Sequence, residues 1–266
     1  PGAMVQPTGL AEQWVLDDAG RRKVKYRITQ DLTCAIEKEE PTSVNSRIDM
    51  KAYPEMICGW CLPRIVHFIV ALRLAWPGKS MFIAKHDYSD AYRRIAHSAK
   101  AVAQTITTLG ALAFVYWRLT FGGSPNLPTW CCFSEIVADL ANEISMCAEW
   151  DPATLKSPDQ PVTPDPIRLG PEIPFAVALP MAVTIPPVIT GRVDGFIDDL
   201  INVFLDTFEN CRRQAHVVPL AMFVTSRPHA GETQEPILRR AILSMEKLAS
   251  NQIEIIIGAS GQEMIA

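Results

Sequence analysis

A pair of adjacent acidic residues interrupts an otherwise apolar stretch between residues 193 and 204. The flanking residues are apolar and partly β-branched, a pattern typical of two strands joined by a tight turn. Asp198 and Asp199 therefore stand at the tip of a predicted β-hairpin. Adjacent carboxylates at such a tip repel each other, and a bound cation relieves that repulsion. The alternative is a solvated turn, because Asp is common in turns for local hydrogen-bonding reasons.

A third carboxylate, Asp87, follows a second predicted strand. Residues 80–86 are short and apolar and come after Gly78, which indicates a buried strand that ends at Asp87. If this strand and the hairpin are neighbours in one sheet, the three carboxylates lie close together. Carboxylate oxygens suit Mg²⁺. Two such ions about 4 Å apart activate a hydroxyl nucleophile and stabilise a departing pyrophosphate.

Hydrophobic periodicity predicts the remaining elements. Strands are expected at residues 22–34, 101–108, 111–119 and 253–257, and helices at residues 63–75, after Ser89 or Asp90, after a Thr129 cap, and at residues 236–249. The helix after Thr129 has an apolar face that includes Trp130 and Val137, which indicates a core position. Residues 151–187 are rich in proline and predict an extended insertion rather than a separate domain.

Composition places the chain among globular proteins. It has 266 residues, of which 48% are hydrophobic and 20% charged, enough to bury a sizeable core. The net charge of −4 argues against a general nucleic-acid binder, but basic residues gather at 21–27 and at Arg93-Arg94. These clusters fit either a solvated face or a phosphate clamp. We expect no membrane span and no signal peptide, hence an intracellular protein of cytoplasm or nucleus, and the initial Pro1 indicates a piece of a longer chain.

Seven cysteines at irregular spacing favour a reducing compartment with free, mostly buried thiols. Cys58 and Cys61 form a C-x-x-C pair. A zinc site would need a second Cys/His pair at suitable spacing, which Cys131-Cys132 does not supply. A thioredoxin-like redox motif would belong to a βαβ pattern that is not evident here. Structural cysteines are therefore favoured, and a thiol oxidoreductase is the remote alternative.

Three segments of the chain resemble motifs of one enzyme family, the reverse transcriptases. Residues 85–94, KHDYSDAYRR, contain the Asp-x-x-x-Ala-Tyr pattern of motif A. Residues 119–130, which begin LTFGGSP, resemble motif B, and residues 196–199 resemble motif C, an aromatic residue, any residue and two aspartates. The order A, B, C is that of the family. With a likeness of Lys25 to Leu32 to the fingers strand, and of Ile257-Gly258 to the end of the palm, the resemblance covers about residues 20–260 and is closest to retrotransposon polymerases.

The resemblance implies an α+β fold with the fingers and palm of a right-hand polymerase. The palm would be a ferredoxin-like sheet with helices on one face, and the thumb and RNase H region would be missing from this piece. The fingers would comprise residues 1–80 and 98–120, and the palm residues 81–97 and 121–266, with the proline-rich insertion at 151–190. The implied activity is RNA-directed DNA synthesis on an RNA or DNA primer-template with dNTP substrates. The alternative is a catalytically decayed nucleic-acid-binding or assembly domain.

The resemblance assigns the metal ions to the three aspartates. Asp87, Asp198 and Asp199 would hold two Mg²⁺ ions, or Mn²⁺ in their place. The backbone carbonyl of Tyr88 would assist. Motif C has Phe196 where Tyr is common in the family.

The resemblance assigns the substrates to residues upstream of the hairpin. Tyr92 would be a steric gate against the ribonucleotide 2′-hydroxyl, with a core tyrosine as the alternative. Phe121 and Gly122 would pack against the incoming nucleotide and the template base, with a Gly-rich turn as the alternative. Arg27, together with Lys25, would hold the triphosphate, where positioning and charge neutralisation carry most of the catalysis.

Overall fold

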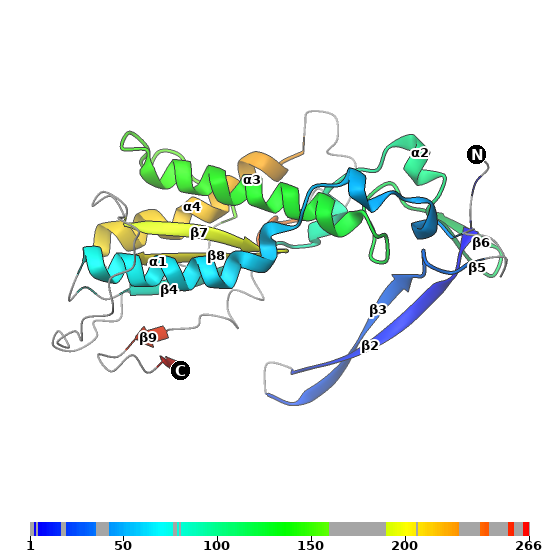
Figure 1. Ribbon diagram of the computed structural model, residues 1–266, viewed down its shortest axis with the longest axis horizontal. Coiled ribbons are helices and arrows are strands. Elements are labelled where there is room, and N and C mark those ends of the chain that lie inside the picture. Colours follow the sequence, from blue (N-terminus) through cyan, green and yellow to red (C-terminus); the bar gives the residue numbers. More distant parts are fainter. Residues whose placement is uncertain are drawn as a thin grey trace. The chain divides into compact units, whose positions relative to one another are not determined.

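The structure is a computed structural model with mixed α and β elements (Figure 1). It describes residues 3, 5–16, 20–35, 43–76, 79, 81–159, 190–205, 207–228 and 240–244, and the backbone of 255–257 and 263–265. The chain divides into two compact units, the first of residues 1–55 and 90–130 and the second of residues 56–89 and 131–266. Our division into fingers and palm segments stays a prediction.

The first unit holds small strands and short helical turns. Its elements are β1 (Val5–Gln6), β2 (Thr8–Leu16), β3 (Arg22–Gln30), η1 (Asn45–Arg47), η2 (Met50–Ala52), η4 (Ala91–Arg94), α2 (Ala99–Val102), β5 (Ile106–Leu109), β6 (Leu112–Val115) and the start of α3 (Asn126–Met146). Strands β1, β5 and β6 form one sheet, and β2 and β3 form an antiparallel ribbon. The register of this ribbon puts Lys23, Lys25 and Arg27 on one face, and Trp14, Tyr26 and Ile28 on the other.

The second unit is built around the antiparallel sheet β4-β8-β7. Its elements are η3 (Ile57–Trp60), α1 (Cys61–Ala75), β4 (Met81–Asp87), β7 (Gly191–Phe196), β8 (Asp199–Leu205), α4 (Phe208–Ser226), and the pair β9 (Ile255–Ile257) and β10 (Glu263–Ile265). Strand β8 lies in the centre and is the most buried strand of the sheet. The predicted strands at residues 81–86 and around Asp198-Asp199 are confirmed, as are the described residues 255–257 of the strand predicted at 253–257. The strand predicted at 22–34 is confirmed only as far as Gln30, because the chain turns at residues 31–34.

Helices cover both faces of this sheet, which corrects the expectation that they cover one. On the first face, Val203 and Leu205 pack against apolar residues of α1, namely Cys61, Ile65, Phe68 and Leu72. On the opposite face, Asn202 donates a hydrogen bond to the backbone oxygen of Gln214 in α4. Because side chains alternate along a strand, β8 needs cover on both sides, and two sets of helices supply it.

Three local predictions are wrong, and each has a local cause. The strand predicted at 101–108 begins only at Ile106, because residues 99–102 form the helical turn α2, which the Ser98 hydroxyl caps by accepting from the Ala101 N–H at 3.3 Å. The predicted helix after Asp90 is the four-residue 3₁₀ turn η4, and the Asp90 side chain does not cap it. Thr129 lies inside α3, where its hydroxyl donates to the Pro125 oxygen at 2.7 Å, so it is not the cap.

Residues 240–244 form no helix, although the prediction for 236–249 includes them. They make a β-bridge between Leu243 and Tyr88 instead. The Ser89 N–H donates to the Ile242 oxygen at 2.8 Å, and the Ser244 N–H donates to the Asp87 oxygen at 2.9 Å. Tertiary pairing therefore overrides local helix propensity. The rest of that predicted helix, and residues 160–189 of the predicted insertion, lie outside the described residues.

One helical stretch, Ile57–Ala75, is long and apolar enough to cross a membrane when judged by length and composition. The core helix of a globular protein passes the same test. Ile65 and Leu72 of α1 pack against the sheet, and a third of the apolar stretch is buried. The absence of a membrane partner stays a prediction.

The cysteines are free thiols, and no disulfide joins the C-x-x-C pair. The Cys58 sulfur lies 3.5 Å from the sulfur of Cys131 rather than bonding to Cys61. Burial raises the pKa of the Cys61 thiol to about 12. Burial and the contact with Cys58 raise the pKa of the Cys131 thiol to about 12 as well. Both thiols therefore stay protonated near neutral pH, which makes them poor nucleophiles.

Alkylation of the native protein should follow this burial. At pH 8 we expect iodoacetamide to modify the exposed Cys147 and to leave Cys61 and Cys131 unmodified until the protein is unfolded. Peptide mass spectrometry after timed labelling measures this difference. Equal labelling rates for Cys61 and Cys147 in the folded protein would contradict it and would favour the thiol-oxidoreductase alternative.

Candidate metal centre

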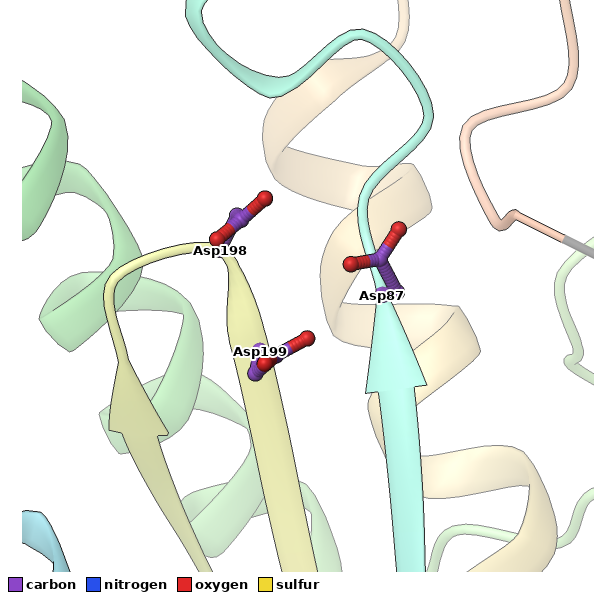
Figure 2. A group of neighbouring side chains, drawn as sticks. All are labelled: Asp87, Asp198 and Asp199. Carbon is purple, nitrogen blue, oxygen red and sulfur yellow. The ribbon is translucent and has the colours of Figure 1, made fainter. Parts of the chain in front are cut away.

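Two strands and a turn bring three carboxylates together. Asp87 ends β4 and lies directly opposite Asp199, the first residue of β8. Asp198 occupies the two-residue turn between β7 and β8, and its backbone oxygen accepts from the Tyr88 N–H at 3.3 Å. Each residue offers a ligand atom within 4.8 Å of the others (Figure 2). The sheet thus supplies the adjacency that the sequence only permitted.

The tip of the hairpin is strained. Ile197, the residue before the aspartate pair, has a φ of 57°. A β-branched residue rarely adopts this left-handed conformation, which costs on the order of 1–3 kcal/mol and is most often retained at functional sites. The turn therefore presents Asp198 at an energetic cost to the fold.

The electrostatics of the cluster favour a cation. Asp87 is 3% exposed, and Asp198 and Asp199 are half-buried, so the like charges are poorly hydrated. The ammonium of Lys85 lies 2.9 Å from Oδ2 of Asp199. His86 contributes no charge at neutral pH, because burial lowers its pKa to about 4.

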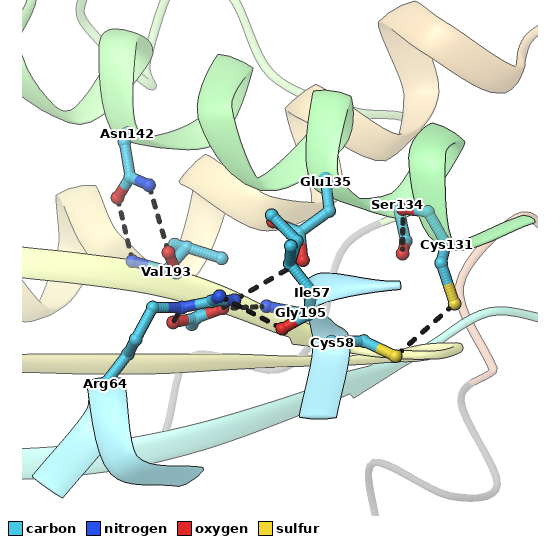
Figure 3. Close-up of polar contacts among 10 residues, drawn as sticks. Ile57, Cys58, Arg64, Cys131, Ser134, Glu135, Asn142, Val193 and Gly195 are labelled. Carbon is cyan, nitrogen blue, oxygen red and sulfur yellow. Dashed lines mark hydrogen bonds and ion pairs between the residues drawn. The ribbon is translucent and has the colours of Figure 1, made fainter. Parts of the chain in front are cut away.

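An ionic network braces β7, the first strand of the hairpin (Figure 3). The guanidinium of Arg64 in α1 makes a bidentate contact with the carboxylate of Asp194, with Nε donating to Oδ2 at 2.6 Å and Nη2 donating to Oδ1. The same Nη2 lies 3.3 Å from Oε1 of Glu135 in α3. Oδ1 of Asp194 also accepts from the Gly195 N–H at 2.8 Å. Three elements are therefore tied together next to the aspartate turn.

A second contact covers the free edge of β7. The Asn142 side chain donates to the Val193 oxygen at 2.9 Å and accepts from the Val193 N–H at 2.8 Å. It replaces a neighbouring strand at this position and protects an edge that would otherwise pair elsewhere.

These bracing residues were not predicted from the sequence. An acidic residue in an apolar strand, as Asp194 is, signals a buried ion pair. Its partner Arg64 is 130 positions away, so no local pattern could identify it.

The side chain of Tyr88 is a core residue. Its ring is 2% exposed and packs edge-on against Phe133 at 6.3 Å. The role that the resemblance implies for its backbone carbonyl stays a prediction.

The remaining predicted site residues belong to the first unit. The Tyr92 ring packs against Phe121 at 5.1 Å and Trp130 at 5.9 Å between ring centroids. Phe121 itself is 46% exposed. Arg27 and Lys25 share the basic face of the β2–β3 ribbon. The structure therefore groups Tyr92 with Phe121, groups Arg27 with Lys25, and groups the aspartates in the second unit.

Gly122 has a backbone conformation and surroundings that exclude a side chain. Its φ is 102°, and a Cβ atom there would lie 2.1 Å from the Gln30 oxygen. The Asn45 side chain holds the same loop, donating to the Gly122 oxygen at 2.8 Å and accepting from the Ser124 N–H at 2.9 Å. The Gly-rich segment is thus a turn held by Asn45, as the Gly-rich-turn alternative expects, and its packing against a nucleotide stays a prediction.

Gly122→Ala should destabilise the first unit far more than Gly110→Ala. Both positions have positive φ, a cost of about 1–2 kcal/mol for alanine. At Gly110 nothing lies within 4 Å of the added Cβ, whereas at Gly122 the clash adds about 1–3 kcal/mol more. Urea unfolding of both variants measures the difference. Equal losses of unfolding free energy would show that the loop is not packed as described.

No family model, no curated protein and no solved structure matches this chain.

Proposed function

We propose that this chain carries the active site of an RNA-directed DNA polymerase of the retrotransposon type. The reaction is nucleotidyl transfer, in which the 3′-hydroxyl of a primer attacks the α-phosphate of a dNTP and pyrophosphate leaves. The observation that carries the proposal is the meeting of Asp87, Asp198 and Asp199 at one end of a sheet, from the strand and hairpin of motifs A and C.

The donor set fits Mg²⁺, with Mn²⁺ as a substitute. All three groups are carboxylates, and Mg²⁺ uses one or two carboxylates with water and phosphate oxygens. The ammonium of Lys85 against Asp199 supports a cation at this position. Two bound ions would lower the pKa of the primer hydroxyl and neutralise the departing pyrophosphate.

The protein's own residues would position the reactants. Asp87 is fixed at the end of β4 by its pairing with Asp199. The Tyr92 ring, held by Phe121 and Trp130, would exclude the 2′-hydroxyl of a ribonucleotide. Arg27 and Lys25 would bind the triphosphate. The implied partners are an RNA or DNA primer-template and dNTP, together with the thumb and RNase H region of a parent polyprotein.

Primer extension tests the proposal. We expect dNTP incorporation opposite RNA and DNA templates with Mg²⁺ or Mn²⁺, more readily when the chain is extended through a thumb, because a thumb holds the primer-template. Incorporation is measured on denaturing gels. If an extended chain binds the primer-template in a gel-shift assay but incorporates nothing, the decayed nucleic-acid-binding domain is the better assignment.

A further inference from the structure

We propose that the Lys85 ammonium is a built-in counter-cation of the aspartate cluster. It pairs with Asp199 until a divalent ion displaces it, and this competition weakens the binding of divalent ions to the free protein. The inference rests on the proposed metal centre and assigns a role to a residue outside the carboxylate set. Its basis is the position of the Lys85 ammonium, 2.9 Å from Oδ2 of Asp199.

The strand register directs Lys85 toward the cluster. Lys85 and Asp87 are two positions apart on β4, so their side chains leave the same face of the sheet. Asp87 is opposite Asp199 and Lys85 is opposite Ile201, which makes Lys85 the diagonal neighbour of Asp199. The side chains of Lys85 and Asp199 are 30% and 25% exposed, so water screens their attraction less than it screens an open surface pair.

Lys85 changes the net charge of the aspartate cluster. Three ionised aspartates carry three negative charges, and Lys85 reduces this to two, the amount that one divalent ion neutralises. A second ion then meets a cluster with no net negative charge and has to displace the Lys85 ammonium from Asp199, and like charges repel. A nucleotide triphosphate would bring the negative charge that favours the second ion. Lys85 therefore biases the cluster toward one ion in the absence of nucleotide.

A second ion pair on the same face of the sheet, between Arg64 and Asp194, can be compared with that of Lys85 and Asp199. Asp194 of β7 lies opposite Ile201 of β8, as Lys85 of β4 does on the other side. Its carboxylate is 8% exposed and accepts from two nitrogens of the Arg64 guanidinium, Nε and Nη2. The Lys85 contact is a single ammonium–oxygen pair with more exposure, and is the easier of the two for a metal ion to displace.

Titration with Mn²⁺ alone tests the proposal, with free Mn²⁺ measured by electron paramagnetic resonance. Lys85→Met removes the charge and keeps an unbranched side chain one atom shorter, so we expect Mn²⁺ to bind about tenfold more tightly, with a second ion taken up at lower concentration. Lys85→Arg keeps the charge and should bind Mn²⁺ no more tightly than the wild type. Lys100→Met lowers the net charge by the same amount at an exposed position of the first unit and should also match the wild type.

The outcomes separate this inference from the proposed function. If Asp198→Asn/Asp199→Asn loses Mn²⁺ binding but Lys85→Met binds no more tightly than the wild type, the role of Lys85 is wrong and the metal centre stands. If the double aspartate variant binds Mn²⁺ as the wild type does, both are wrong. Equal tightening in Lys85→Met and Lys100→Met would overturn the local role in favour of net charge. Circular dichroism checks folding, and Lys85→Gln replaces Lys85→Met under the same criteria if the latter does not fold.

Discussion

Asp198→Asn/Asp199→Asn is expected to reduce primer extension by at least about a thousandfold. The double variant keeps the shape of both side chains but removes two of the three charges that would bind the ions. Metal stabilisation of the transition state contributes several kcal/mol, and each 1.36 kcal/mol is about tenfold in rate. Single-nucleotide incorporation with Mg²⁺ and with Mn²⁺, followed over hours, measures a loss of this size.

The same variant should unfold at an equal or higher temperature than the wild type. Asp87 stays buried beside the turn, and removing two neighbouring negative charges relieves repulsion at the hairpin tip, although the Lys85 contact is lost. Glu143→Gln, at an exposed position on α3, is the control and should leave both incorporation and stability unchanged. Incorporation that survives in the double variant would remove the polymerase assignment.

The elements that the sequence predicted well are those whose signals are local. Strand β4 is a short apolar run that ends at an acidic residue, and the β7–β8 hairpin is two apolar runs around a polar pair. Period-2 alternation and turn chemistry act over a few residues, so both could be placed without knowing the tertiary fold. Their adjacency could not, because the register of β4 against β8 joins residues more than 110 positions apart.

The wrong predictions concern contacts between segments that are far apart in the sequence. Residues 240–244 pair with the segment after β4, and that contact is invisible in a local helix pattern. Both faces of the sheet are covered because β8 buries residues on both sides, as Asn202 and Val203 show, whereas the resemblance led us to expect one covered face. At the site, the partners of Asp194 and Asp199 are cations that only the folded chain identifies.

Arg64→Met should destabilise the second unit by about 3 kcal/mol. The substitution leaves Asp194, which is 8% exposed, without its bidentate partner and beside a second carboxylate, Glu135. Breaking a buried ion pair from one side costs about 3–5 kcal/mol, and the partial exposure of Arg64 places the expected value at the lower end. Guanidinium unfolding of the wild type and the variant measures the loss.

A double-mutant cycle and a pH series show whether the loss comes from uncompensated charge. Arg64→Met/Asp194→Asn should be more stable than Arg64→Met alone, because the buried charge is gone. Burial raises the pKa of Glu135 in the folded protein, while Arg64 opposes that rise. A carboxyl group whose pKa is raised by folding does not reduce the free energy of unfolding below its unfolded pKa of about 4.3. It reduces that free energy as the pH increases from there through its pKa in the folded protein. Because the variant lacks the opposing cation, its deficit should be smaller at pH 5 than at pH 7. A deficit that is independent of pH, and that Asp194→Asn does not reduce, would mean that Arg64 acts through the packing of its side chain rather than through its charge.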